Sequence, residues 1–359
     1  MIREADVARR KKPEKLTADA AAGAGKTDEL YQKLVRDIEE KYGPGTLIHL
    51  GELTASCPHY STGILSLDEA SGIGGLPRGR IVEIYGPEAA GKTLLSLQCI
   101  ASVQKEGGRC AFIDVEQAMN TGFAAMLGVD LDNLAFVQPQ SGEQALDIMI
   151  SLAESGLFSL IAVDSVAALL PEAEIDGDML DLQLGAQARM MSKALRRCGP
   201  VLNQMGTTVI FINQLRERIG MTFGNPEVTP GGRALKFYAS MRLEVRRKET
   251  LRTGSEITGS TISVRVTKNK VAAPFREAEF DLYFDSGISL EKQILSRAVE
   301  LGLIGKTGSW YSLDGEKIGQ GTQSAVEWLR QNPEQARSLE SSVRREMGLD
   351  DQDHHAEET

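Results

Sequence analysis

The stretch GPEAAGKT, residues 86–93, decides the fold class of this chain. It fits the pattern of a phosphate-binding loop, in which a first glycine is followed after four residues by Gly91, Lys92 and Thr93. The apolar segment RIVEIY, residues 80–85, precedes the loop, and a helical pattern follows it. A strand, a loop and a helix in this order turn backbone N–H groups and the positive helix end toward a phosphate. The sequence therefore predicts a nucleotide-binding α/β domain.

A shorter echo of the loop, GAGKT at residues 23–27, lacks this context. The first glycine of the pattern would fall at Ala20, and no strand-like segment precedes it. We interpret the echo as a chance occurrence in an arm rich in alanine and glycine.

Composition excludes several classes of protein. Of 359 residues, 42% are hydrophobic and 25% charged, and Asp164 interrupts the longest apolar run, so no membrane span is predicted. No apolar segment follows the basic N-terminus, which argues against a secretory signal and favours a cytoplasmic location. The four cysteines form no CxxC pair and are predicted to be buried free thiols rather than zinc ligands or disulfides. The net charge of −10 says little about any local surface.

The chain before the loop divides into two segments. Residues 1–27 show no apolar periodicity and are predicted to form a flexible arm. Residues 28–52 are predicted to hold a helix and a linker, with Asp28 as the cap and Gly43 at the end. The helix carries one apolar stripe, which requires a partner surface on the main domain or on a neighbouring subunit.

Residues 53–286 alternate short β-branched strands with helices. This pattern predicts a mostly parallel central sheet with right-handed crossovers and helices on both faces. The last segments of the block, RLEVRRKE, STISVRVTKNKV and EAEFDLYFD, have no helices between them and predict an antiparallel extension of the sheet.

Two further segments follow the core. Residues 287–348 are predicted to form a small α+β domain, in which Asn332 caps a helix that starts at Pro333 and ends at Gly348. Residues 349–359 carry five carboxylates and no Lys or Arg, and read either as a solvated tail or as a competitor of nucleic acid for a basic surface.

The loop supplies most of a nucleotide site. Lys92 would contact the β- and γ-phosphates, and the Thr93 hydroxyl would join the shell of Mg²⁺. Asp164 ends the buried strand LIAVD at the same edge of the sheet and is the second candidate ligand of the metal. The residues predicted to hold the nucleotide are Gly86, Pro87, Glu88, Ala89, Ala90, Gly91, Lys92 and Thr93.

Hydrolysis also requires a group that activates water. The strand CAFID is followed by VE, which makes Glu116 a candidate and Asp114 its competitor. The residues alone leave both open.

Several long motifs in order resemble those of the RecA family of bacterial recombinases, from about residue 28 to residue 348: GPEAAGKT, AFIDVEQAMN, IAVDSVAALLPEAEI, ARMMSKALR, VIFINQLRERIGMTFGNPEVTPGGRALKFYASMRLEVRR and VTKNKVAAPF. The resemblance implies an ATP- and Mg²⁺-dependent enzyme that forms a helical homo-filament on single-stranded DNA. It also implies pairing with homologous double-stranded DNA, strand exchange with DNA-stimulated ATP hydrolysis, and activation of self-cleavage of the repressor LexA.

The resemblance assigns roles residue by residue. It selects Glu116 as the group that activates water, and Gln214 as the sensor of the γ-phosphate. Lys268 and Lys270 of the KNK motif are implied to reach ATP bound by the adjacent subunit, and Lys306 and Lys317 to belong to a unit that captures duplex DNA. The positions near adenine are Asn120 and Phe123.

Two DNA-binding loops are implied at about residues 174–185 and 215–232. The implied DNA contacts are Arg189, Arg196, Arg216, Gly231, Gly232 and Arg233, with Leu184 and Ile219 as wedges between bases. Loop packing is the alternative for the two wedges, and Arg246 and Arg247 could be an ordinary solvated pair.

The sequence departs from the family pattern at four positions. Gln117 stands in place of a histidine, Asn120 and Phe123 in place of aspartate and tyrosine, and Arg233 in place of a common asparagine. Loss of the aspartate removes an acceptor for the adenine amino group. Because of these departures, a second hypothesis is a filament scaffold that regulates partner proteins without catalysing strand exchange. A third and less favoured hypothesis is a hexameric helicase-like motor.

Overall fold

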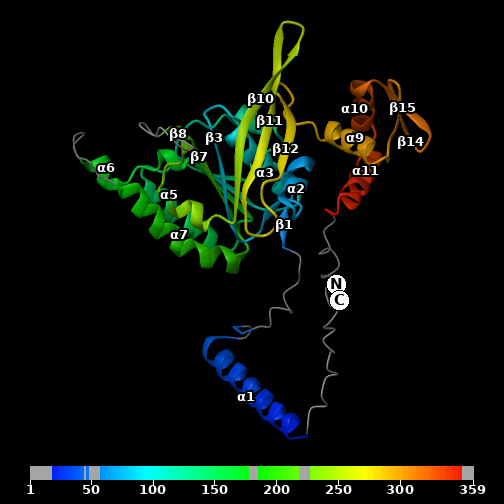
Figure 1. Ribbon diagram of the computed structural model, residues 1–359. Helices are drawn as coiled ribbons and strands as arrows, with labels where there is room; N and C mark the ends of the chain where they lie inside the picture. Colours follow the sequence, from blue (N-terminus) through cyan, green and yellow to red (C-terminus); the bar gives the residue numbers. More distant parts are fainter. Residues whose placement is uncertain (1–17, 44–45, 48–56, 178–184, 218–226, 350–359) are drawn as a thin grey trace, which may run out of the picture. The chain divides into compact units, whose positions relative to one another are not determined.

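A computed structural model describes most of the chain (Figure 1). The chain divides into two compact units, Met1–Ala55 and Ser56–Thr359. Helix α1 (Ala18–Tyr42) lies in the first unit, and all other elements lie in the second. The described residues are 18–43, 46–47, 57–177, 185–217 and 227–349. Most of the predicted arm and the acidic tail lie outside them.

Helix α1 is longer than expected. It begins at Ala18 rather than at Asp28, so the prediction of a flexible arm is wrong for residues 18–27. The physical reason is that the alanine-rich start of the helix has a high helix propensity, which outweighs its two glycines. The end agrees with expectation: Gly43 has a φ of 104°, and its N–H donates to the carbonyl oxygen of Glu39 at 2.8 Å.

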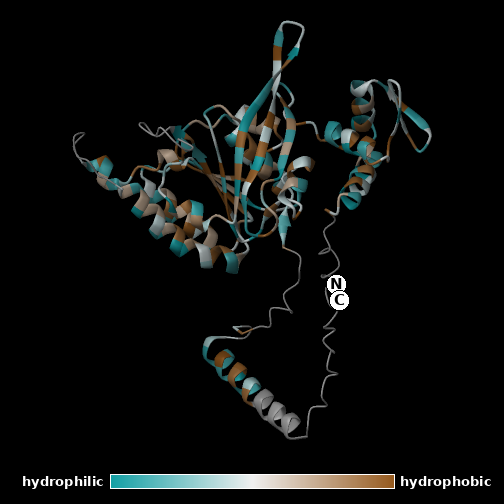
Figure 2. Ribbon diagram, in the orientation of Figure 1, coloured by the Kyte–Doolittle hydropathy of each residue, from teal (hydrophilic) through white to brown (hydrophobic). Residues whose placement is uncertain are grey.

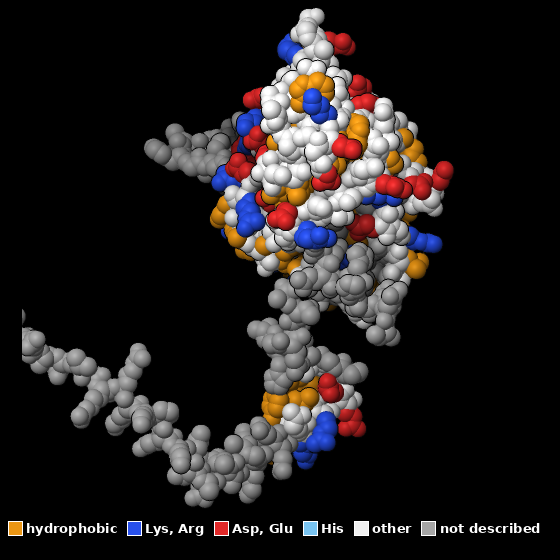
Figure 3. Space-filling model, turned by 90° about the vertical axis from the view of Figure 1, so that its right-hand side faces the viewer, with side chains coloured by type: hydrophobic (Ala, Val, Ile, Leu, Met, Phe, Trp, Pro, Cys, Tyr) orange, Lys and Arg blue, Asp and Glu red, His pale blue; other side chains and the backbone are white. Residues whose placement is uncertain are grey.

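One side of α1 is apolar and exposed. Leu30, Leu34 and Tyr42 have exposed fractions of 69%, 52% and 66%. Figure 3 shows hydrophobic side chains gathered on one side of the described part of this helix and charged side chains on the other.

The second unit is built on an eight-stranded sheet with the order β12-β11-β10-β3-β7-β6-β4-β5. The strands from β10 to β5 in this order are parallel, and β10, β11 and β12 pair antiparallel, as predicted. The short strand β5 was not among the expected elements. The strands are β3 (Ile81–Gly86), β4 (Cys110–Asp114), β5 (Leu134–Val137), β6 (Leu160–Asp164), β7 (Thr208–Gln214), β10 (Met241–Thr253), β11 (Glu256–Asn269) and β12 (Glu277–Tyr283).

Helices cover both faces of the sheet. Alternate residues of β3 point to opposite faces: Val82 and Ile84 join a core layer with α3 (Lys92–Lys105), and Ile81 joins a layer with α5 (Gly142–Glu154) and α7 (Ala186–Met205). The central strands accordingly carry hydrophobic stretches (Figure 2). The shorter elements are β1 (His59–Tyr60), α2 (Leu65–Ser71), β2 (Leu76–Pro77), α4 (Thr121–Met126), the 3₁₀ helix Val166–Ala168, α6 (Glu172–Asp176), β8 (Arg216–Glu217), β9 (Glu227–Val228) and α8 (Ala234–Tyr238).

The C-terminal domain packs three helices against a small antiparallel sheet. Its elements are α9 (Leu290–Glu300), β13 (Gly305–Thr307), β14 (Trp310–Leu313), β15 (Glu316–Gln320), α10 (Thr322–Gln331) and α11 (Pro333–Glu346). Pro333 starts α11, as expected. Asn332 stands at the N-cap position of α11, as expected, but its side chain makes no capping bond there: the amide donates to the Trp328 carbonyl oxygen at 2.8 Å, at the end of α10.

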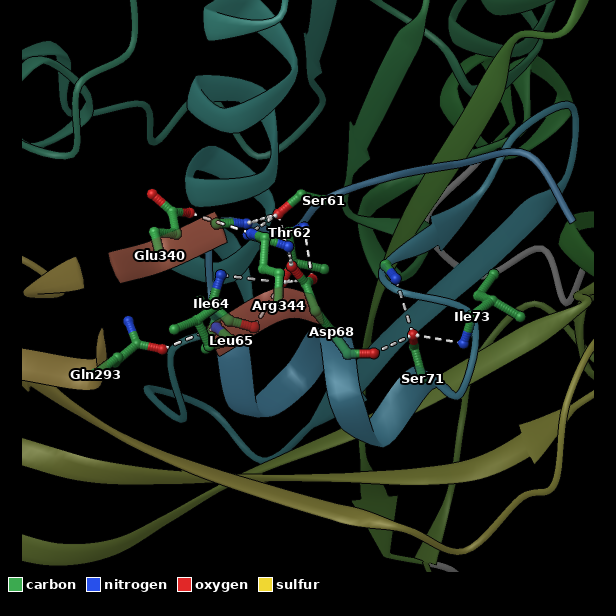
Figure 4. A network of polar contacts seen from close by, with 12 residues as sticks. Ser61, Thr62, Ile64, Leu65, Asp68, Ser71, Ile73, Gln293, Glu340 and Arg344 are labelled. Carbon is green, nitrogen blue, oxygen red and sulfur yellow. Dashed lines mark hydrogen bonds and ion pairs between the residues drawn. The ribbon is translucent and has the colours of Figure 1, made fainter. Parts of the chain in front are cut away.

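Helix α2 attaches the C-terminal domain to the core. Leu65 packs into the hydrophobic cluster of the C-terminal domain, and its N–H donates to Gln293 Oε1 at 2.9 Å. The fully buried Asp68 accepts hydrogen bonds from the backbone N–H and the hydroxyl of Thr62 (Figure 4). Its carboxylate also forms an ion pair with Arg344 at 3.2 Å. Burial raises the pKa of Asp68, and the Arg344 guanidinium acts against that rise.

Removing Arg344 is expected to destabilise this junction. Arg344→Gln leaves Asp68 buried without its cation, which costs about 3 kcal/mol in the free energy of unfolding. Urea denaturation measures the loss. Arg337→Gln, an exposed position on the same helix, is the matched control. Equal stability of the two variants would contradict this account of the junction.

Candidate active site and nucleic-acid interface

The phosphate loop joins β3 to α3 and is shaped by two glycines. A Cβ atom on Gly86 would lie 2.1 Å from the carbonyl oxygen of Val245 on the neighbouring strand, so no other residue fits there. Gly91 stands at the N-cap of α3 with a φ of 98°, a left-handed conformation that glycine adopts without strain. The loop therefore delivers its backbone to the N-terminus of a buried helix, where N–H groups are free of intrahelical partners.

Lys92, Thr93 and Asp164 meet at this end of the sheet, as predicted. The Thr93 hydroxyl donates to Asp164 Oδ2 at 2.5 Å, and Lys92 Nζ donates to the Pro87 carbonyl oxygen at 2.6 Å. Burial lowers the pKa of Lys92. Burial also raises the pKa of Asp164 to about 6, and the negative charge of Glu116 adds to the rise.

An open pocket of about 600 Å³ lies over the loop. Lys92, Thr93, Glu116, Asp164 and Gln214 line it. The all-oxygen pair of Thr93 and Asp164 suits a hard cation such as Mg²⁺, which fits the expected metal ligands. The further residues that line the pocket include Phe123, Arg247 and Phe284.

Glu116 and Asp114 have different surroundings. Glu116 is exposed in the pocket, and its Oε1 accepts hydrogen bonds from Gln214 Nε2 at 2.9 Å and from the Ser165 hydroxyl. Asp114 is buried and accepts backbone N–H bonds from residues 118 and 119 at 3.3 and 3.2 Å. Asp114 thus holds the loop after β4, and Glu116 is the carboxylate that faces the pocket.

The aromatic side of the pocket has one member that the sequence analysis missed. Asn120 caps α4, with its Oδ1 accepting the Phe123 N–H at 2.9 Å, and this cap sets the start of the helix that carries Phe123. Phe284, directly after β12, brings a second ring to the same pocket. The signal that could have found it is an aromatic residue at the end of a strand in the sheet that carries the loop.

Lys268 and Lys270 do not reach the pocket of their own chain. In the sheet register, Lys268 pairs with Arg242 of β10, and Arg242 pairs with Glu83 in the middle of β3. The phosphate loop, in contrast, follows the end of β3. Their ammonium groups donate to the carbonyl oxygen of Phe237 at 3.1 and 2.9 Å. Both cations therefore lie together at the C-terminal end of α8.

The predicted DNA contacts are described in part. Arg189 and Arg196 are exposed on α7, Arg216 is exposed on β8, and Arg233 is exposed at the start of α8. Leu184 and Ile219 lie outside the described residues, as do residues 178–184 and 218–226 of the two predicted loops.

The turn before α8 requires its glycines. Gly231 and Gly232 have φ values of 81° and 76°, and Cβ atoms there would lie 2.7 Å from Val166 Cγ1 and 2.8 Å from Ala188 Cβ. The Gly231 N–H donates to the side-chain oxygen of Gln187 at 3.2 Å. Helix α7, which carries Arg189 and Arg196, is thereby fastened to the turn that carries Arg233.

A second contact links this turn to the pocket. The buried Asn213 donates from Nδ2 to the Pro230 carbonyl oxygen at 3.2 Å and to Glu83 Oε1 at 3.0 Å. Its neighbour Gln214 holds Glu116. The sequence analysis did not single out Asn213.

The two lysines expected on the C-terminal domain lie over aromatic rings. Lys306 Nζ is 5.2 Å from the ring centroid of Tyr311, and Lys317 Nζ is 4.7 Å from that of Trp310. Figure 3 shows Lys and Arg side chains interspersed with Asp and Glu on the face turned toward the viewer, rather than a single basic patch.

Three of the four cysteines, Cys99, Cys110 and Cys198, are buried and free, as predicted, and Cys57 is partly buried. Among the helices that the structure describes, none has the length and apolar character needed to cross a membrane.

Family models of known proteins match nearly all of the chain that the structure describes. Residues 29–289 match the family model of the RecA N-terminal domain, and residues 292–348 match that of the RecA C-terminal domain. The chain belongs to the RecA family.

Relatives of the RecA family cover similar lengths. Protein RecA of Cutibacterium acnes is 53% identical over 316 residues, which are 88% of this chain and 91% of the relative. Protein RecA of Heliobacterium modesticaldum is 51% identical over 326 residues, 90% of this chain and 94% of the relative. Protein RecA of Halalkalibacterium halodurans is 50% identical over 316 residues, 88% of this chain and 90% of the relative.

Membership of the RecA family confirms the predicted fold and activity. The chain is a recombinase and a DNA-dependent ATPase that acts in recombination, repair and the SOS response, binds DNA and forms filaments. The parallel sheet with its antiparallel extension and the small C-terminal domain are the RecA fold.

Proposed function

We propose that the pocket over residues 86–93 binds ATP with Mg²⁺ and hydrolyses it when subunits assemble on single-stranded DNA. The observation that carries the proposal is the bond from Gln214 to Glu116, because Gln214 ends the strand that leads into the second predicted DNA loop. One side chain thus joins the hydrolytic carboxylate to the DNA-binding segment.

Binding of ATP rests on the loop and on two aromatic rings. Lys92, now held on the Pro87 carbonyl, would exchange that acceptor for phosphate oxygens, which are better partners for an ammonium group. Phe123 and Phe284 line the same pocket and would stack on the adenine. The Asn120 side-chain oxygen already accepts the Phe123 N–H as a helix cap, so only its second lone pair would be left for the amino group of the base.

Thr93 and Asp164 would hold the metal. When bound, Mg²⁺ would supply positive charge to the β- and γ-phosphates. The two side chains already share a hydrogen bond of 2.5 Å, so their oxygens lie close enough to act on one cation. Removal of Mg²⁺ by a chelator is therefore expected to abolish hydrolysis.

Glu116 would orient the attacking water and accept its proton. Gln214 and Ser165 hold the carboxylate through one oxygen, Oε1, which leaves the second oxygen for the water. A γ-phosphate that attracts the Gln214 amide would release Glu116 and shift Gln214. Because Asn213, next in the chain, is bonded to Pro230, this shift would be transmitted to the turn that carries Arg233.

Assembly would complete the site. Lys268 and Lys270 lie together away from their own pocket and would face the nucleotide of an adjacent subunit. The exposed apolar stripe of α1 supports head-to-tail contact between subunits. The proposal also includes residues 287–348 as a duplex-binding domain with a restraining acidic tail, a LexA-type repressor as partner, and a cytoplasmic location.

ATP hydrolysis with and without single-stranded DNA, at a fixed salt concentration, tests the proposal. Strong stimulation by DNA is expected. Binding of DNA without stimulation would contradict the proposed link through Gln214 and favour a filament scaffold. Cleavage of purified LexA in the presence of ATP and single-stranded DNA tests the regulatory part separately.

Arg233 is expected to increase the salt dependence of DNA binding. Its side chain is exposed beside the Gly231–Gly232 turn, and each phosphate contact with single-stranded DNA adds about 0.7 to the slope of log K against log salt. Arg233→Asn is therefore expected to bind single-stranded DNA more weakly, with a slope lower by about 0.7. A fluorescence titration over several salt concentrations measures this, and an unchanged slope would rule it out.

A further inference from the structure

Arg247 lies in the nucleotide pocket although it comes from the antiparallel extension of the sheet. It lines the same pocket as Lys92 and Glu116. Its Nη2 donates to the carbonyl oxygen of Ala89, at the tip of the phosphate loop, at 3.2 Å. From the sequence, this residue could equally belong to the DNA-binding surface or to an ordinary solvated pair.

The two members of that pair have different surroundings. Side chains of neighbouring residues on a strand point to opposite faces, and Arg246 is held by Glu227 and Glu244, both at 2.6 Å. The register of β10 against β11 shifts directly after Arg247, between Arg247 and Glu249. Such irregularities re-aim side chains next to active sites, and here Arg247 is aimed at the loop.

Apart from Arg247, the pocket is lined by more acidic than basic side chains. Three carboxylates line it, those of Glu88, Glu116 and Asp164, and Lys92 is the ammonium group at its base. A nucleotide polyphosphate would bring several more negative charges into this space. A guanidinium has five N–H donors, so one bond to Ala89 leaves others for phosphate oxygens.

We propose that Arg247 is a further nucleotide-binding residue, which supplies a second cation to the polyphosphate of the nucleotide bound in its own subunit. This inference rests on the proposed function of the pocket. It also ties the nucleotide to the exposed hairpin formed by β10 and β11, because the hairpin continues directly from Arg247.

Equilibrium binding of fluorescent ADP and of a fluorescent non-hydrolysable ATP analogue to the full chain without DNA tests the proposal. Arg247→Gln is expected to weaken binding about tenfold, the loss typical of one charge-assisted contact. Arg247→Lys, which keeps the charge, is expected to lose less. Arg252→Gln, at an exposed position farther along the same strand, is the matched control and is expected to stay within about twofold of the unchanged protein.

Lys92→Ala separates this inference from the proposed function. If Lys92→Ala loses nucleotide binding and Arg247→Gln binds like Arg252→Gln, the inference is overturned and the pocket assignment stands. If Lys92→Ala also binds normally, the pocket assignment fails and the inference fails with it.

A measurement on the unchanged protein serves if Arg247→Gln does not fold. Hydrogen exchange around Arg247 and Ala89 is expected to slow when ADP is added, because the guanidinium would be fixed between loop and phosphate. Exchange that slows at the phosphate loop but not around Arg247 would overturn the inference.

Discussion

Replacing Glu116 by glutamine is expected to lower DNA-stimulated ATP hydrolysis by about 10²–10⁴-fold, the usual contribution of a general base. Glutamine keeps the size of the side chain and can still pair with Gln214 and Ser165, but it cannot accept a proton from water. Nucleotide binding is therefore expected to be retained. The measurement is the steady-state hydrolysis rate with saturating single-stranded DNA, together with nucleotide affinity.

Asp114→Asn is the informative comparison for that variant. Asp114 accepts two backbone N–H bonds in the loop after β4, so its replacement is expected to reduce stability and to lower hydrolysis only through misplacement of Glu116. A Glu116→Gln protein with near-normal hydrolysis would contradict the assignment of the base, and a larger catalytic loss in a stable Asp114→Asn protein would transfer the role to Asp114.

Removing either lysine of the KNK motif is expected to lower hydrolysis in the filament by about 10²–10³-fold, as for the loss of one positive group that stabilises a transition state. Lys268→Ala and Lys270→Ala leave the pocket of their own chain intact, because neither side chain lines it. Nucleotide binding by unassembled protein is therefore expected to be unchanged, whereas DNA-stimulated hydrolysis is lost.

Hydrolysis by Lys105→Ala, an exposed lysine at the end of α3, serves as the control for the loss of a positive charge. If Lys268→Ala and Lys270→Ala hydrolyse ATP as fast as this control, the two lysines have no role at the nucleotide. If either substitution weakens nucleotide binding by the unassembled protein, the lysine acts on the nucleotide of its own chain, which would contradict a role in the adjacent subunit's site.

The elements around the phosphate loop could be predicted because their signals are local. A β-branched run before GPEAAGKT gives β3, and the absence of helical segments between the last three strands of the core gives the antiparallel strands. One boundary and one capping bond, which depend on competing interactions, were predicted wrongly. An alanine-rich stretch extended α1 to Ala18, and the Asn332 amide bonded backward to Trp328 rather than forward to α11.

The site could be predicted where a motif carries it, as for Lys92, Thr93 and Asp164. Asn213 and Phe284 were missed, and Arg247 was not assigned to the pocket, because each makes a contact that only the folded sheet creates. In the sequence, Asn213 is only a polar residue near the end of a strand. Its hydrogen bond to the Pro230 carbonyl oxygen forms only in the folded protein. Arg247 reaches Ala89 only because β10 lies beside β3.

A mixing experiment tests most directly the central claim that each active site is shared by two subunits. Glu116→Gln protein keeps its lysines, and Lys270→Ala protein keeps its glutamate. In a randomly mixed filament with one-to-one composition, about a quarter of the head-to-tail interfaces combine an intact Glu116 with an intact Lys270. The account predicts that two inactive proteins recover about that fraction of DNA-stimulated ATP hydrolysis when mixed. A mixture that stays as inactive as its components, while forming mixed filaments on DNA, would contradict it.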